Sequence, residues 1–177
     1  MSSESSVDTK PRTDDIDAAQ DGSRDKAKTE RIDRLAVRLL TPNEVSFMWN
    51  LVKQSILDGS DGYITTDIEL ARVLSALTEG RLQCWIVACD DTKHFVGAVL
   101  TQVVNDGLVG KKGLSILSLS AKRPVRISAW REGLSVLVKF AKSRDCSYVT
   151  AMTRNPRVVE MVTAMGFETC SLCRKDL

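Results

Sequence analysis

The chain has 177 residues and a mass of 19.5 kDa, about the size of one domain. Hydrophobic residues make up 43% of it and charged residues 27%, which excludes collagen-like and wholly disordered proteins. No stretch approaches the roughly 20 apolar residues of a membrane-spanning helix, so we expect no membrane partner. The five cysteines form no dense, even-numbered framework, which favours reduced thiols and a cytoplasmic location.

The net charge of +2 averages two dissimilar parts of the chain. Residues 1–34 carry seven basic and nine acidic side chains, no aromatic residue and few large apolar ones. Such a segment cannot bury enough surface to offset the entropy of ordering it. We therefore predict a charged, flexible tail over residues 1–34, suited to binding a protein partner, and a single folded domain over residues 35–177. The first residues also lack the basic and apolar stretches of a secretory signal.

Hydrophobic periodicity predicts ten elements in the folded domain. A period of two indicates strands, a period of 3.6 indicates helices, and Thr-x-x-Glu or Asn-Pro marks the helix starts. In chain order these are a strand over 35–40, helices over 42–58 and 67–79, strands over 84–89, 95–104 and 114–119, a helix over 128–144, a strand over 147–152, a helix over 156–165 and a strand over 167–173. Hairpin strands followed by strand–helix alternation predict an α/β (α+β) protein, with a mixed, mainly antiparallel sheet and helices on both faces.

The order of the elements and one motif resemble the GNAT superfamily, the Gcn5-related acyl-CoA N-acyltransferases. The motif is NPRVVEMVTAMGF, in which Asn155 precedes the last helix and Gly166 and Phe167 follow at 11 and 12 residues. The resemblance covers residues 35–177 and implies the GNAT fold, β-α-α-β-β-β-α-β-α-β. Over a short length the same stretch is similar to GNAT-like virion and morphogenesis proteins of short-tailed bacteriophages.

The resemblance also implies acetyl-CoA as cofactor. GNAT proteins bind its pyrophosphate in a loop between the fourth strand and the next helix, usually R/Q-x-x-G-x-G/A, where backbone N–H groups approach the phosphates closely. This chain has AKRPVRISAWR over residues 121–131 in that place, and no register restores the glycines. The residues that match the binding positions are Arg126, Ser128 and Ala129 at the helix start, and Asn155 near the pantetheine arm.

Two positions of the family's chemistry are changed as well. Many members have a tyrosine four residues before the glycine of Gly-Phe, which reprotonates the leaving thiolate, whereas this chain has Val162. Many take a glutamate on or near the fourth strand as base, but residues 114–119 are only Leu, Ser and Ile. Asp106 is the nearest carboxylate in sequence. We therefore assign no catalytic residue.

Basic side chains are concentrated around the same loop and helix. Residues 111–144 contain nine Lys or Arg and one Glu, a local charge of +8. Such a region could hold the phosphates of CoA, a nucleic-acid backbone or an acidic partner, and a solvated helix face is an equally ordinary explanation. Only Trp130 could stack on a base, so we expect no sequence-specific nucleic-acid binding, while non-specific contact stays open.

We expect structural roles, and no metal binding or catalysis, for the cysteines and the histidine. Cys170 and Cys173 lie three residues apart in a predicted strand, where they face opposite sides, and no second ligand pair completes a zinc site. The other three cysteines fit small buried hydrophobes. His94, the single histidine, lies in a polar turn. We predict no metal site.

Two hypotheses of different classes follow. In the first, a GNAT-fold protein without catalysis acts as a structural or assembly component through its tail and basic face. The phage resemblance places this version in a virion or the host cytoplasm. In the alternative, an active acetyl-CoA-dependent N-acyltransferase transfers an acetyl group to an amine. The changed loop, Val162 and the missing carboxylate favour the first hypothesis, and the basic region favours the second.

Overall fold

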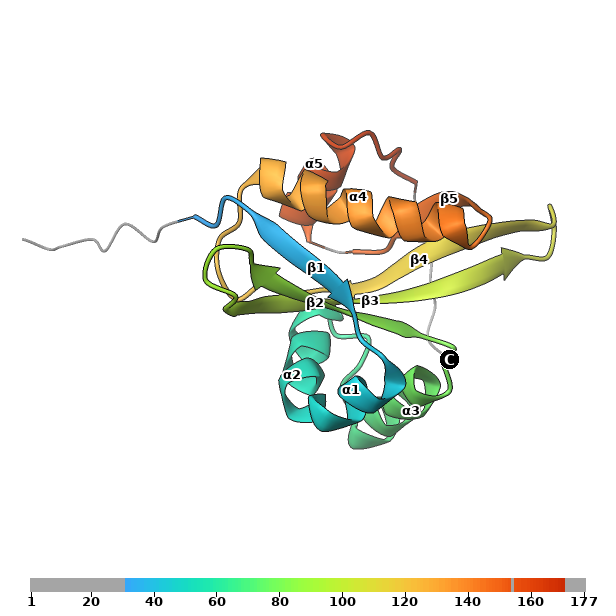
Figure 1. The fold of residues 1–177 in the computed structure, drawn as a ribbon. Helices are drawn as coiled ribbons and strands as arrows, with labels where there is room; N and C mark the ends of the chain where they lie inside the picture. Colours follow the sequence, from blue (N-terminus) through green and yellow to red (C-terminus); the bar gives the residue numbers. More distant parts are fainter. Residues whose placement is uncertain (1–30, 154, 171–177) are drawn as a thin grey trace, which may run out of the picture.

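A computed structural model of the chain describes residues 31–153 and 155–170. Figure 1 shows a central sheet with α1–α3 on one face and α4 and α5 on the other. In chain order the elements are β1 (Leu35–Leu39), α1 (Pro42–Phe47), α2 (Trp49–Gly59), α3 (Asp67–Thr78), β2 (Gln83–Cys89), β3 (Phe95–Asp106), β4 (Lys111–Leu119), α4 (Ile127–Ser143), β5 (Cys146–Ala151) and α5 (Pro156–Thr163). The predicted fold class is confirmed.

The five strands lie in the order in which they occur along the chain, β1-β2-β3-β4-β5. Neighbouring strands are antiparallel except for β4 and β5, which are parallel. A parallel pair needs a long crossover connection, and here α4 supplies it. The sheet is therefore mixed and mainly antiparallel, and its one parallel pair lies under α4.

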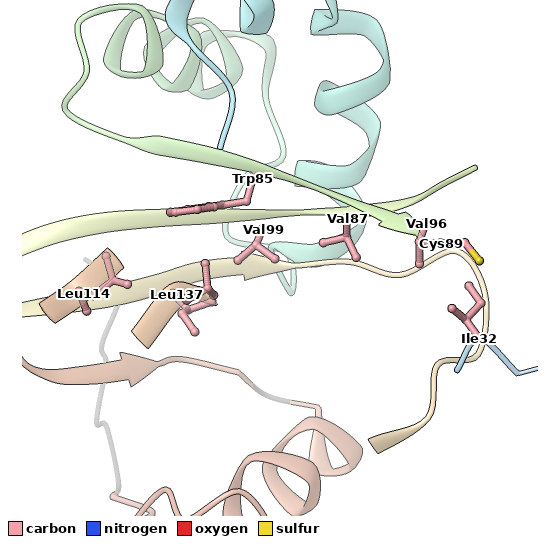
Figure 2. Packing of buried hydrophobic residues seen from close by; sticks show 10 residues of the cluster. Ile32, Trp85, Val87, Cys89, Val96, Val99, Leu114 and Leu137 are labelled. Carbon is pink, nitrogen blue, oxygen red and sulfur yellow. The ribbon is translucent and has the colours of Figure 1, made fainter. Parts of the chain in front are cut away.

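Each face of the sheet has its own hydrophobic core, because strand side chains alternate between the two faces. Trp85, Val87 and Leu137 belong to the core under α4, and Figure 2 shows Ile32 at the same end of that core as Cys89 and Val96. The buried Trp85 indole donates a 2.9 Å hydrogen bond to Thr101 Oγ1, which satisfies its polar group. In the described part of the chain, no helix combines the length and the apolar character that crossing a bilayer requires.

The helix starts follow the predicted capping pattern. Thr41 and Thr66 each accept a hydrogen bond from the backbone N–H three residues on, and the glutamate there bonds back to the threonine N–H. The single helix predicted over 42–58 is wrong in one respect, since it is divided at Met48 into α1 and α2. The division lets α1 contact α3 while α2 contacts β3 and β4. Tertiary packing thus overrides a continuous apolar period.

The two ends of the predicted domain differ from the expectation. Residues 167–170 form no strand, and residues 171–173 lie outside the described residues. Alternating apolar residues alone do not make a strand, because its backbone groups also need a neighbouring strand to pair with. Residues 1–30 of the predicted tail lie outside the described residues too. The last residues assigned to the tail contact the domain: Ile32 is 5% exposed and pairs with Val125 in a parallel bridge.

Candidate functional site

A cavity of about 120 Å³ lies where β4 and β5 separate. Their pairing ends at Ile116 and Ala151, and β4 continues to Leu119 without a partner on that side. The β3–β4 register also shifts here, because Leu100 faces Ser118 while the next residue, Thr101, faces Ile116. Such a bulge bends a strand, and bulges recur beside functional sites. The sheet therefore opens at one defined point along its parallel pair.

The walls of the cavity are mainly apolar and come from three elements. The sheet contributes Ile116, and α4 contributes Leu134 and Leu137. The wall on the α5 side consists of Val158, Met161, Val162 and Met165. Although the predicted inner face of α5 is apolar, no residue of this helix is fully buried. These side chains stay half-exposed because they border a cavity and not a filled core. Beside β5 the cavity adjoins a wider groove of about 840 Å³, which shares Leu134 and Val162 with it.

Polar side chains meet at the end of the cavity where β5 stops. Thr153 Oγ1 donates a 2.8 Å hydrogen bond to Asp61 Oδ2 and accepts one of 3.1 Å from the Asn155 backbone N–H. Asp58, at the end of α2, also lines the cavity and accepts a hydrogen bond from Gln54. The α2–α3 loop is thereby tied to the start of α5. Two carboxylates border a mainly apolar space.

A close helix–strand contact brings these carboxylates to the cavity. Gly59, the last residue of α2, lies against β4, and a Cβ there would be 2.7 Å from both the Leu119 carbonyl carbon and Ser118 Oγ. Only glycine allows this approach. From the sequence, Asp58 and Gly59 indicated a helix end, so Asp58 and Asp61 were missed as site residues. The signal that could have found them is a carboxylate pair flanking a glycine-rich turn, which is common on surfaces and has little specificity.

The start of α4, like that of α2, has no side-chain cap. Arg126 is its N-cap residue and makes no side-chain cap hydrogen bond, unlike Thr41, Thr66 and Asn155 at α1, α3 and α5. The Arg126 guanidinium instead pairs with Asp33, with Nε 2.6 Å from Oδ1. The Arg126 backbone N–H donates to the Ile32 carbonyl at 3.0 Å. The N-terminal segment of the domain is therefore joined to this helix start.

The four residues expected to bind the cofactor do not lie together. Asn155 lines the cavity and caps α5, accepting a 3.0 Å hydrogen bond from the Arg157 N–H. Arg126 and Ser128 are exposed at the start of α4, and Ala129 is fully buried. In the described residues, none of these three is part of the cavity wall. The structure thus separates one candidate in the cavity from two on the adjoining surface.

The two positions weighed for catalysis have different places. Val162, at the position where the resemblance implies a tyrosine, lines the cavity. Asp106 lies in the β3–β4 hairpin, opposite Lys111 and several residues from the cavity end of β4. Its carboxylate accepts hydrogen bonds from the N–H groups of Leu108 and Val109 and so stabilises the turn. Asp106 is not a residue of this cavity.

The basic region divides into two groups along α4. This helix has 17 residues and is about 25 Å long, so its ends are well separated. Lys122, Arg123, Arg126 and Arg131 are near its start. Lys139, Lys142 and Arg144 lie toward its end, and Lys111 and Lys112 are near them, since Lys112 pairs with Cys146. Arg131 also donates to the Ala164 carbonyl at 3.4 Å, which joins α4 to α5. The basic residues are therefore spread along the whole length of α4.

Among the thiols of the described residues, Cys84 and Cys89 are buried, Cys146 is partly buried and Cys170 is exposed. Burial raises the pKa of Cys84 to about 12, so this thiol stays protonated. Hydrogen bonds from Thr92 lower the pKa of Cys89, which lies at the end of β2. No group of three or more His, Cys, Asp or Glu side chains in the described part of the chain could hold a metal ion. Cys173 lies outside that part.

Comparison with known proteins identifies the fold. No protein-family model matches the chain, and no curated protein sequence matches it. Among solved structures it is similar to an aminoglycoside acetyltransferase from an uncultured soil metagenomic sample (14% identity, 81% of this chain and 97% of that one, TM-score 0.62). It is also similar to a predicted acetyltransferase from Clostridium acetobutylicum solved with acetyl-CoA (14%, 81% and 96%, 0.60). Glucosamine-6-phosphate N-acetyltransferase from Arabidopsis thaliana is a third (15%, 81% and 97%, 0.55). The chain has the GNAT fold.

Proposed function

We propose that this GNAT-fold protein binds an acyl-coenzyme A, acetyl-CoA in the simplest case, and transfers the acyl group to an amine. The observation that carries the proposal is the apolar cavity at the point where β4 and β5 separate, with carboxylates at one end. An apolar cavity of about 150 Å³ can hold a benzene molecule. A volume of about 120 Å³ therefore suits the acyl thioester end of the ligand, while the rest would lie in the adjoining groove.

The surroundings of the cavity suit the other parts of this ligand. The first-turn N–H groups of α4 have no partners within the helix, and the helix dipole favours an anion there. Lys122, Arg123 and Arg126 add positive charge at the same end. The Arg126 backbone N–H is not free to bind a phosphate, because it donates a hydrogen bond to the Ile32 carbonyl. We therefore assign phosphate binding to the Ser128 side chain and to the backbone N–H groups that follow Arg126.

The chemistry that the ligand supplies is an activated thioester. Acyl transfer forms a bond from the amine nitrogen to the acyl carbon and breaks the bond from that carbon to sulfur. The nitrogen also loses a proton, which Asp58 or Asp61 can accept directly or through a water molecule. Thr153 holds the Asp61 carboxylate in place. Val162 cannot donate a proton to the thiolate, so the thiolate would leave as the anion or take a proton from solvent.

A second candidate function is that of a structural or assembly component without catalysis. Two observations favour it: Val162 lines the cavity where an acid is expected, and the Arg126 guanidinium is engaged by Asp33. In this case the cavity is a feature of the fold without a catalytic role. It differs from the first in one measurable way, since it requires no turnover.

Calorimetric titration of the full chain with acetyl-CoA tests the proposal, followed by thiol release with a panel of amines. We expect micromolar binding and amine-dependent release of CoA. A Leu134→Trp variant should abolish binding because its side chain fills the cavity. The matched control is Leu108→Trp, at a hairpin position that is 94% exposed. Absence of binding at millimolar acetyl-CoA contradicts the acyltransferase, and binding without turnover by any amine favours the second candidate.

A further inference from the structure

Residues 31–34 form an N-terminal strap across the loop that precedes α4. The Ile32 N–H donates to the Pro124 carbonyl at 3.0 Å, and the Ile32 carbonyl accepts from the Arg126 N–H at 3.0 Å. The Ile32 side chain is 5% exposed within the hydrophobic core under α4 (Figure 2). At the other end of the strap, the Arg34 carbonyl accepts from the Asp90 N–H at 3.1 Å. Backbone bonds and a buried anchor thus fix the strap in place.

The strap places one carboxylate on the helix start. Asp33 follows the buried Ile32, and its Oδ1 lies 2.6 Å from Arg126 Nε. The two side chains are 56% and 59% exposed, so the Asp33 carboxylate can rotate away while Ile32 stays anchored. An anion that approaches the α4 start therefore meets a cation that is already paired, and a negative charge beside it. The Asp33 carboxylate also repels a ligand phosphate beside it, and salt screens this repulsion.

We propose that Asp33 is a built-in anionic competitor at the start of α4, which weakens the binding of phosphate-bearing ligands until its carboxylate moves off Arg126. The inference rests on the proposed function, because it concerns the surface that we assign to the phosphates of the acyl donor. Competition for one cation is reciprocal. A ligand phosphate on Arg126 favours release of Asp33 by some factor, and release of Asp33 raises the ligand affinity by that same factor.

A double-mutant cycle in the full chain tests the competition. Asp33→Asn removes the charge and keeps the shape, and Arg126→Gln removes the cation. Acetyl-CoA and inorganic pyrophosphate are titrated at low and high salt. We expect Asp33→Asn to tighten both ligands about two- to fivefold at low salt, the scale of an exposed ion pair, and to have a smaller effect in the Arg126→Gln background, where only the direct repulsion is removed. The control is Asp90→Asn, which removes a nearby carboxylate that pairs with Arg34 and Lys93.

The outcomes separate this inference from the proposed function. Unchanged affinity in Asp33→Asn, equal tightening in Asp90→Asn, or tightening that is undiminished without Arg126 overturns the competition but leaves acetyl-CoA binding intact. Tightening for pyrophosphate when no variant binds acetyl-CoA supports the competition and contradicts the acyltransferase. If no variant binds either ligand, both are overturned. A thermal melt of each variant shows whether the strap still anchors the domain.

Discussion

The two faces of the sheet differ in how completely their helices are packed. On the α1–α3 face, Val45, Val52 and Ile56 are at most 1% exposed, and two of the helices begin with a capping box. On the other face, Val87 and Leu114 are also fully buried, but α5 has no fully buried residue and a cavity lies where the pairing of β4 and β5 ends. Natural proteins depart from ideal packing and capping chiefly where function requires it. We therefore expect the first face to contribute more to stability, and we place the proposed ligand on the second.

Truncation of a core side chain on the α1–α3 face should have the largest effect on stability. Ile56 on α2 is 1% exposed, so Ile56→Ala should lower the free energy of unfolding by about 2–5 kcal/mol. Met161→Ala on α5 should cost less than about 1 kcal/mol, because Met161 borders a cavity and is half-exposed. Urea denaturation measures both. Equal losses in the two variants would contradict the division of roles between the faces.

The contact between α2 and β4 joins the two faces, and Gly59 tests it. Gly59→Ala places a Cβ 2.7 Å from the Leu119 carbonyl carbon and Ser118 Oγ, which forces α2 away from the strand. We expect a loss of about 1–3 kcal/mol in stability, the usual cost of overpacking, and slower amine-dependent release of CoA because Asp58, a proposed proton acceptor, moves with the helix end. Gly107→Ala is the control, since its Cβ would meet nothing within 4 Å. An unchanged melting temperature in Gly59→Ala would refute the close contact.

The two ends of α4 offer a comparison for binding. Arg126→Ala, at the start, should weaken acetyl-CoA binding by about 1–3 kcal/mol, the scale of a lost charge-assisted hydrogen bond. The pairing with Asp33 places the expected value at the lower end. Lys142→Ala, in the last turn of the helix, removes the same charge and should leave affinity unchanged at moderate salt. Equal losses would show that the ligand senses only net charge.

Local signals predicted most of the fold. The capping boxes at Thr41 and Thr66 located two helix starts, and the alternation at Leu35, Val37 and Leu39 located the first strand and its inner face. These patterns are readable because each is satisfied within a few residues. The break at Met48 and the absence of a strand over the described residues 167–170 depend on which distant element is available for packing or pairing. Periodicity carries no such information.

The site was harder to predict, for the same reason. The motif ending in Gly166 and Phe167 led to Asn155, which does line the cavity, and to Val162. Asp58 and Asp61 reach the cavity only because α2 lies against β4 at Gly59, a contact between residues about 60 positions apart. Asp33 pairs with Arg126 over an even longer separation. Asp106 is close to β4 in sequence but lies at the hairpin end of the strand.

The smallest expected effect is a pH dependence that belongs to the α1–α3 face. The Thr41 backbone N–H donates to Glu44 Oε2 at 2.8 Å, and with Arg38 it lowers the pKa of Glu44 from 4.5 to about 2. The folded state then binds this proton less readily than the unfolded state, so the stabilisation is complete above about pH 4.5 and is lost as pH falls to about 2. Glu44→Gln should therefore reduce the fall of the melting temperature between pH 4.5 and 2. Glu69, which caps α3 in the same way and also has a lowered pKa, keeps its own contribution. Glu132→Gln on α4 controls for the loss of a charge, and a Glu44→Gln curve parallel to the wild-type curve would contradict the assignment.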